Sequence, residues 1–141
     1  MKSIIILLIV LFSFTAHAQN MTGLWNANGM RLVLLQAPND SKISITTSLN
    51  SSSTGLVTLQ FDCSIDYKDG KITMMGWGNE FKAVSNQLEC TITPYFIATG
   101  IIVGERPGRR FHASGNINAI TRCTNGEGEE VVIKDLDGIW K

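Results

Sequence analysis

The chain has few of the residues on which enzymes most often depend. It contains two histidines, and because His17 lies in the first 18 residues, His112 is the only histidine in the rest of the chain. Its three cysteines form no Cys-x-x-Cys pair. These absences exclude a histidine-rich zinc site. The sequence also lacks a phosphate-cradling glycine loop and the strand-turn-helix motif of a nucleophile elbow.

Charged residues are also sparse, at 17% of the chain, with 12 Lys and Arg against 12 Asp and Glu. A near-neutral surface argues against a nucleic acid or an anionic membrane as the partner. No long apolar run follows residue 18. We therefore expect a soluble protein with no membrane span.

The first 18 residues have the pattern of a secretory signal peptide. Lys2 supplies a positive start, a mostly apolar run covers Ile4 to Phe14, and Ala16-His17-Ala18 is a small-x-small cleavage site. We predict a signal peptide over 1–18 and a protein exported to the periplasm or secreted. The short start and the Ala-x-Ala site favour a bacterial host. The remaining residues, 19–141, have the length of a single domain.

Almost everything after residue 19 alternates between apolar and polar residues, which is the period of a β-strand, and no long stretch has the helical period. Residues 57–67 form a long alternating strand, and Asp69-Gly70 predicts a tight hairpin into residues 72–75. Further strands are expected over 30–36, 42–49, 88–93, 95–103, 111–123 and 131–133. We predict an all-β fold, a single antiparallel meander β-barrel of about eight strands, with a β-sandwich as the alternative.

Two features of these strands carry further expectations. The run 95–103 is almost continuously apolar, which indicates a strand that is buried on both sides or lines an interface. The three cysteines, Cys63, Cys90 and Cys123, all fall on the apolar phase of their strands. In an oxidising compartment two of them would pair, and the sequence does not choose among the three possible pairs. The alternative is three buried thiols that pack as small hydrophobic groups.

A short pattern occurs at both ends of the expected domain. Thr22-Gly23-Leu24-Trp25 near the start is echoed by Asp137-Gly138-Ile139-Trp140 at the end. A glycine, an aliphatic residue and a tryptophan at each end suggest that the two terminal strands meet and close the sheet.

Gly23-Leu24-Trp25, placed shortly after a signal peptide and before a β meander, resembles the first strand of the calycin superfamily of lipocalins and avidins. The stretch from Thr22 to Asn26 also looks like the opening of avidin's first strand. The resemblance implies an eight-stranded barrel that is plugged at one end by the Gly-x-Trp and binds a small ligand or a protein at the other. A second lipocalin motif and the later tryptophan-containing biotin motifs of avidin have no match, so biotin is not expected.

The candidate catalytic groups do not form a known arrangement. His112 lies on the opposite strand phase from the cysteines, so a cysteine–histidine pair is not expected. Asp62 and Asp66 are four residues apart on one strand, roughly 13 Å, and glycosidase carboxylates are only about 5 to 9.5 Å apart. Asp135 and Asp137 flank a terminal turn and suit turn chemistry. We predict a protein that is not an enzyme, with no catalytic residue, metal or cofactor.

Two binding hypotheses remain. In the first, the barrel binds a small apolar or amphipathic ligand in an interior pocket, and the alternative is a filled core without a cavity. The pocket would be lined by the inward residues Phe61, Ile65, Met74, Leu88 and Phe111.

In the second hypothesis the protein is a protein-interaction module, such as an inhibitor or a secreted effector, and has no ligand cavity. A Pro-Gly turn carries three arginines that would present a cationic tip to an acidic partner, and a tryptophan beside two methionines offers a second contact patch. These surface candidates are Trp77, Arg106, Arg109 and Arg110.

Overall fold

A computed structural model of the chain describes residues 20–38, 41–51, 55–105 and 108–141. The predicted signal peptide lies outside these ranges. Within them, there is no helix long and apolar enough to cross a membrane. The ten strands are β1 (Gly23–Ala27), β2 (Met30–Gln36), β3 (Lys42–Ser51), β4 (Gly55–Lys68), β5 (Lys71–Gly78), β6 (Phe81–Ser85), β7 (Leu88–Val103), β8 (Arg110–Cys123), β9 (Gly128–Asp135) and β10 (Gly138–Trp140).

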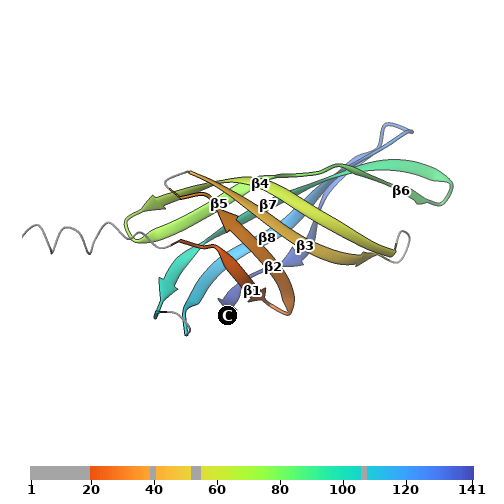
Figure 1. Cartoon of the computed structure of the whole chain (residues 1–141). Helices are drawn as coiled ribbons and strands as arrows, with labels where there is room; N and C mark the ends of the chain where they lie inside the picture. The colour runs from red at the N-terminus through yellow and green to blue at the C-terminus, as the bar shows by residue number, and fades with distance from the viewer. Residues whose placement is uncertain (1–19, 39–40, 52–54, 106–107) are drawn as a thin grey trace, which may run out of the picture.

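Eight of the strands follow one another as a meander that curls into a half-barrel (Figure 1), in the order β1-β2-β3-β4-β5-β7-β8-β10. Every pair is antiparallel. The other two strands lie beside this path: β6 pairs with β7, and β9 pairs with β8. The predicted all-β antiparallel meander is therefore confirmed.

The tight hairpins follow from residues that tolerate a positive φ. Asp69 and Gly70 have φ values of 53° and 77°, which confirms the predicted two-residue turn between β4 and β5. Asn28 and Gly29 have φ values of 51° and 82° and form the equivalent turn between β1 and β2.

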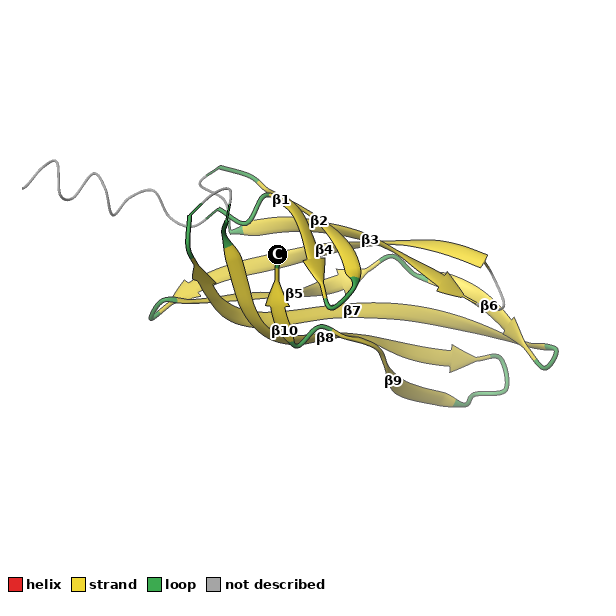
Figure 2. Ribbon diagram, turned by 90° about the horizontal axis from the view of Figure 1, so that it is seen from below, coloured by secondary structure: helices red, strands yellow, loops and turns green. Residues whose placement is uncertain are grey.

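The two ends of the domain meet at one side of the half-barrel, where β10 lies between β8 and β1 (Figure 2). The backbone N–H of Asn26 donates to the carbonyl of Lys141 at 2.8 Å, and the N–H of Lys141 donates back to Asn26 at 3.2 Å. The prediction that the terminal strands meet is confirmed.

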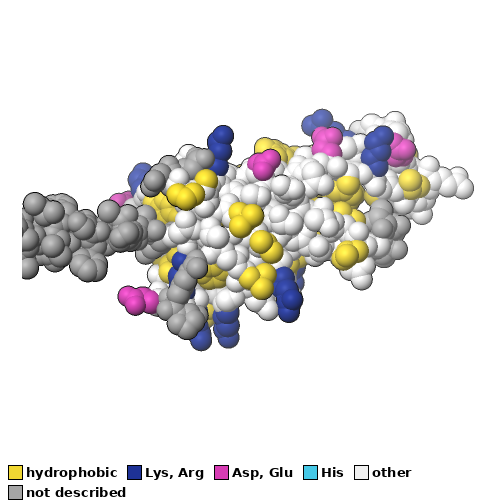
Figure 3. Space-filling model, viewed as in Figure 1, with side chains coloured by type: hydrophobic (Ala, Val, Ile, Leu, Met, Phe, Trp, Pro, Cys, Tyr) yellow, Lys and Arg dark blue, Asp and Glu magenta, His cyan; other side chains and the backbone are white. Residues whose placement is uncertain are grey.

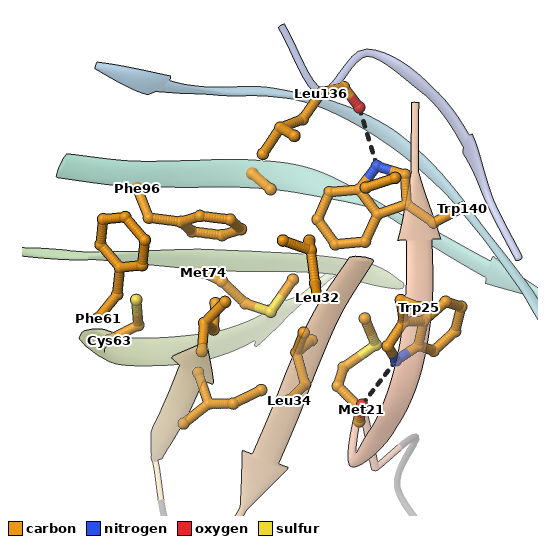
Figure 4. Close-up of a cluster of buried hydrophobic side chains, with 14 of the residues drawn as sticks. Met21, Trp25, Leu32, Leu34, Phe61, Cys63, Met74, Phe96, Leu136 and Trp140 are labelled. Carbon is orange, nitrogen blue, oxygen red and sulfur yellow. Dashed lines mark hydrogen bonds between the residues drawn. The ribbon is translucent and has the colours of Figure 1, made fainter. Parts of the chain in front are cut away.

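The repeated Gly-x-Trp pattern has the same structure at both ends. Trp25 and Trp140 are 3% and 0% exposed, and each indole N–H donates to the carbonyl four residues earlier, that of Met21 at 2.9 Å and that of Leu136 at 2.8 Å (Figure 4). Phe111 packs edge-on against both indoles, with ring centroids 6.4 Å and 4.9 Å away. The indoles thus bury their apolar area while their polar groups stay hydrogen-bonded.

The apolar run in β7 alternates between the two faces of the sheet. Phe96 and Ala98 are fully buried, whereas Ile101 and Val103 are 43% and 47% exposed. The expectation of a strand buried on both sides is therefore wrong, because only the even-numbered residues face the core. The alternative, that its outer residues line an interface, stays a prediction.

Pro94 lies in β7 at the point where the neighbouring strand changes from β5 to β6. Residues 95–100 of β7 pair with β5, and residues 88–92 pair with β6. Pro94 lies between these two segments and has no N–H to continue the ladder. Its ring lies so close to Gly78 that a Cβ on that glycine would approach Pro94 Cγ to 2.8 Å. The chain therefore leaves β5 at this point and returns as β6.

The disulfide joins Cys90 of β7 to Cys123 of β8, which are direct partners in the strand register. The prediction of one intramolecular disulfide is confirmed. Cys63 keeps a thiol that is buried in the core on β4.

Candidate binding site

Four of the five predicted pocket residues lie packed in the hydrophobic core, at no more than 4% exposure. Phe61, Met74 and Phe111 are fully buried and Ile65 is nearly so. The Phe61 ring lies against that of Phe96 (Figure 4), and the two ring centroids are 5.6 Å apart. The fifth, Leu88, is half-buried at the start of β7 and lies outside that cluster. None of the five lines the surface depression described below.

The arginines of the predicted cationic tip do not lie together as one exposed group in the described part of the chain. Arg106 lies outside the described residues. Arg109 is half-buried, with its guanidinium 5.0 Å from the ring centroid of Trp25, and it donates a hydrogen bond to the carbonyl of Asn20. Arg109 thus packs over the end of the barrel, and Arg110 stays exposed.

Trp77 lies on a different part of the surface. Its cross-strand partner on β7 is Tyr95, which is eight residues from the end of that strand, or about 26 Å. The predicted surface residues therefore do not form one patch. Trp77 is 52% exposed, and its ring is tilted by 55° against that of Tyr95, with centroids 4.9 Å apart.

A depression of about 460 Å³ lies next to this aromatic pair, on the outer face of the sheet. It sits where β5 ends and β6 begins, at the break set by Pro94. Sites that bind small molecules commonly have volumes of about 300–1,000 Å³ and combine aromatic or apolar walls with a few polar groups. The lining residues, which we call the Trp77 groove, are Trp77, Glu80, Thr91, Thr93, Ile120 and Arg122.

The strand register explains why these side chains converge. Thr93 of β7 is paired with Ile120 of β8, and Thr91 is paired with Arg122. Because alternate residues of a strand point to the same face, both pairs lie on the outer face with Tyr95. Glu80 enters from the segment that joins β5 to β6.

The polar groups of the groove are only partly used within the protein. Thr93 Oγ1 donates to Glu80 Oε1 at 3.3 Å. The guanidinium of Arg122 forms no ion pair or hydrogen bond with any residue that the structure describes. Next to the groove, Oδ1 of Asn118, opposite Tyr95, is a buried acceptor with no hydrogen-bond partner among the described residues. The exposed Arg122 guanidinium thus keeps donors that a bound molecule could use.

A second group of exposed hydrophobic residues lies on the opposite side, over β1 and β2. Leu24, Val33 and Leu35 are 63%, 42% and 60% exposed, and the first two are direct cross-strand partners. On the face drawn in Figure 3, the hydrophobic side chains lie in small groups interrupted by uncharged polar surface. Leu24 and Val33 line a depression of about 610 Å³ that also includes Arg31 and Lys134 but, unlike the Trp77 groove, contains no aromatic side chain.

The candidate catalytic residues stay apart. His112 is exposed on the outer face of β8, and Asp62 and Asp66 are exposed on β4. Asp135 Oδ1 accepts the N–H of Asp137 at 2.8 Å, which confirms the predicted turn role. Within the described part of the chain, no three His, Cys, Asp or Glu side chains are grouped so that they could hold a metal.

The remaining thiol has the character of a structural cysteine. Burial, the larger cause, and the negative charge of neighbouring Asp62 together raise the pKa of Cys63 to about 12 from an ordinary value of 9.0. Because the thiolate is the reactive form, a cysteine with this pKa is a poor nucleophile near neutral pH.

The sequence pattern indicates Trp77 as a surface residue but does not indicate the rest of its groove. In the sequence, Thr91 and Thr93 fall on the polar phase of the strand expected over 88–93, and Glu80 lies in a segment with no clear pattern. Arg122 falls on the polar phase of the strand expected over 111–123. The sequence contains no signal for the register that brings β7 and β8 together, so these residues could not be grouped.

No protein-family model matches the chain, and comparisons with curated proteins and with solved structures find no match. The structure itself is an all-β half-barrel, which is compatible with a calycin-like barrel.

Proposed function

We propose that this protein is an exported, non-enzymatic binding protein that binds its partner in the Trp77 groove, on the outer face of the sheet, and not in the barrel interior. One contrast carries the proposal: large aromatic side chains such as Phe96 and Trp140 pack the interior at 0% exposure, whereas Trp77 is 52% exposed beside a depression of about 460 Å³. Exposed aromatic side chains beside a concave surface are typical of binding sites.

Export is part of the proposal. The signal-peptide pattern over 1–18 supports it, and the Cys90–Cys123 disulfide is consistent with an oxidising compartment. A relationship to the calycins is part of it as well. The Gly23-Leu24-Trp25 strand and the buried tryptophans beside the point where the two terminal strands meet support that relationship.

Site-specific photo-cross-linking tests the binding face. Met75 lies two residues before Trp77 on the same face and is 39% exposed, so a benzoylphenylalanine at this position would react with a molecule bound beside the groove. Leu24, which is 63% exposed on the opposite side, is the matched control position. Both variants would be irradiated in the exported fraction of the host cells.

We expect adducts from position 75 and none from position 24. Excess unmodified protein should suppress the adducts, whereas excess Trp77→Ala protein should not, because this variant lacks the main contact side chain. Equal cross-linking from both positions would contradict the proposed site. Native mass spectrometry that finds a small molecule released only on unfolding would favour the interior-pocket hypothesis instead.

A further inference from the structure

The proposed function leaves open which class of molecule the groove binds, and the chemistry of its lining bears on this. Resting on that proposed function, we infer that the groove binds a neutral glycan, through stacking of a pyranose ring on the Trp77 indole. The juxtaposition of one exposed indole with a carboxylate, two hydroxyls and a guanidinium carries the inference.

The indole offers the surface that a sugar ring requires. An aromatic ring has a negative face, which attracts the weakly positive C–H groups on the flat side of a pyranose. Trp77 is exposed and is supported from one side by Tyr95. The ring thus has a fixed backing without being covered.

The remaining lining suits the hydroxyl groups at the edge of the same sugar. Glu80 supplies an acceptor, Arg122 supplies donors, and Thr91 and Thr93 supply hydroxyls that act as both. A sugar hydroxyl also donates and accepts, so it can use both kinds of partner. The length from Tyr95 to Thr91 along β7, about 13 Å, suits a short oligosaccharide.

The charges favour a neutral glycan over an acidic one. Glu80 and Arg122 are the charged side chains of the lining, and their formal charges cancel. Lys82 and Glu89, farther along the same sheet, form an ion pair at 3.1 Å and cancel as well. A uronic-acid or sulfated glycan would find no excess positive charge here.

The same composition argues against an apolar protein surface as the occupant. An apolar partner surface would take Glu80 and the Arg122 guanidinium out of water without offering them hydrogen bonds, which is unfavourable, whereas sugar hydroxyls can bond to both.

Affinity gel electrophoresis tests the inference with two polymers that share a backbone and differ in charge. The intact mature protein would be run through gels that contain hydroxyethylcellulose, which is neutral, or carboxymethylcellulose, which is anionic. We expect retardation by the neutral polymer and less by the anionic one. Trp77→Ala should weaken the interaction about tenfold, and Arg122→Gln should weaken it to a smaller degree. Leu24→Ala is the matched control, because it also removes an exposed apolar side chain, and it should leave retardation unchanged.

A solution measurement uses the burial of the other two tryptophans. Trp25 and Trp140 are 3% and 0% exposed, so iodide quenching of the tryptophan fluorescence reports mainly on Trp77. Cellohexaose should protect this fluorescence from iodide. A normal far-UV circular dichroism spectrum would show that each variant is folded.

The outcomes separate the two proposals. Retardation that Trp77→Ala does not change would overturn the glycan site. An absence of retardation and of protection, combined with Trp77-dependent protein adducts in the cross-linking experiment, would overturn the glycan inference and leave the binding face intact. If the cross-linking experiment gives no adducts dependent on Trp77 either, the proposed function fails together with it.

Discussion

Replacing Trp140 with phenylalanine tests the closure of the half-barrel. Trp140 is fully buried, packs against Phe96 and Phe111, and donates its indole N–H to the carbonyl of Leu136 at 2.8 Å. Phenylalanine keeps an aromatic ring in the core but removes the N–H donor and the pyrrole part of the indole. The substitution thus separates the specific role of tryptophan from general hydrophobicity.

The expected loss has two parts. The carbonyl of Leu136 would lose its partner in the core, and an unsatisfied buried acceptor costs about 1–3 kcal/mol. The missing part of the indole removes buried apolar area, and at roughly 0.8 kcal/mol per methylene-sized group this costs about 2 kcal/mol. With some relaxation of the neighbours, we expect Trp140→Phe to lower the free energy of unfolding by about 3–4 kcal/mol.

Urea unfolding followed by far-UV circular dichroism would measure this change without relying on tryptophan fluorescence. Trp77→Phe is the matched control, since Trp77 is 52% exposed, and a surface substitution of this kind should change stability by less than about 0.5 kcal/mol. Trp25→Phe should behave like Trp140→Phe, because its indole forms the equivalent bond to Met21. A loss below about 1 kcal/mol for Trp140→Phe, or one equal to that of Trp77→Phe, would refute the reasoning.

Three further predictions concern the cysteines and one glycine. Because the Cys90–Cys123 disulfide closes a separation of 33 residues, the double alanine variant should lose about 3–4 kcal/mol in urea unfolding, and an unchanged midpoint would contradict this. The pKa of Cys63 is raised in the folded state to about 12 from 9.0, so the stability that the protonated thiol contributes is complete below pH 9 and is lost as the pH rises toward 12. Between pH 8 and pH 10.5, the free energy of unfolding should therefore fall more for the wild type than for Cys63→Ala. Equal falls for the two proteins would disprove this prediction. A Cβ at Gly76 would collide with the backbone of β4, so Gly76→Ala should cost about 3 kcal/mol or more, whereas Gly108→Ala, which meets only an ordinary contact, should be nearly neutral in the same assay.

Much of the fold was readable from the sequence because it depends on local rules. The alternation over 57–67 and the Asp69-Gly70 turn give the β4–β5 hairpin, since strand period and turn chemistry act over a few residues. The repeated Gly-x-Trp indicated that the termini meet. Its structural basis was not visible, because the bonds from Trp25 and Trp140 to carbonyls four residues earlier depend on a bend in the chain.

The features that were missed depend on register. The choice of Cys90 and Cys123 as disulfide partners follows from their direct pairing across β7 and β8, and all three cysteines had the same strand phase in the sequence. The short strand β6 was missed because Phe81–Ser85 is too brief to show a clear period. Four of the predicted pocket residues, Phe61, Ile65, Met74 and Phe111, do face the core, but their packing against one another depends on how tightly the sheet curls.

Pro94 connects the fold to the proposed site. A proline in the interior of a long strand normally argues against that strand, because it cannot donate to a neighbour. Here β7 tolerates it because its neighbour changes from β5 to β6 at this point. The same change ends β5 directly after Trp77, leaves the indole at the end of its strand, and opens the outer face where Glu80 enters. The proline that breaks the ladder therefore lies at the point of β7 where the groove opens, between Thr93, which lines it, and Tyr95, which supports Trp77.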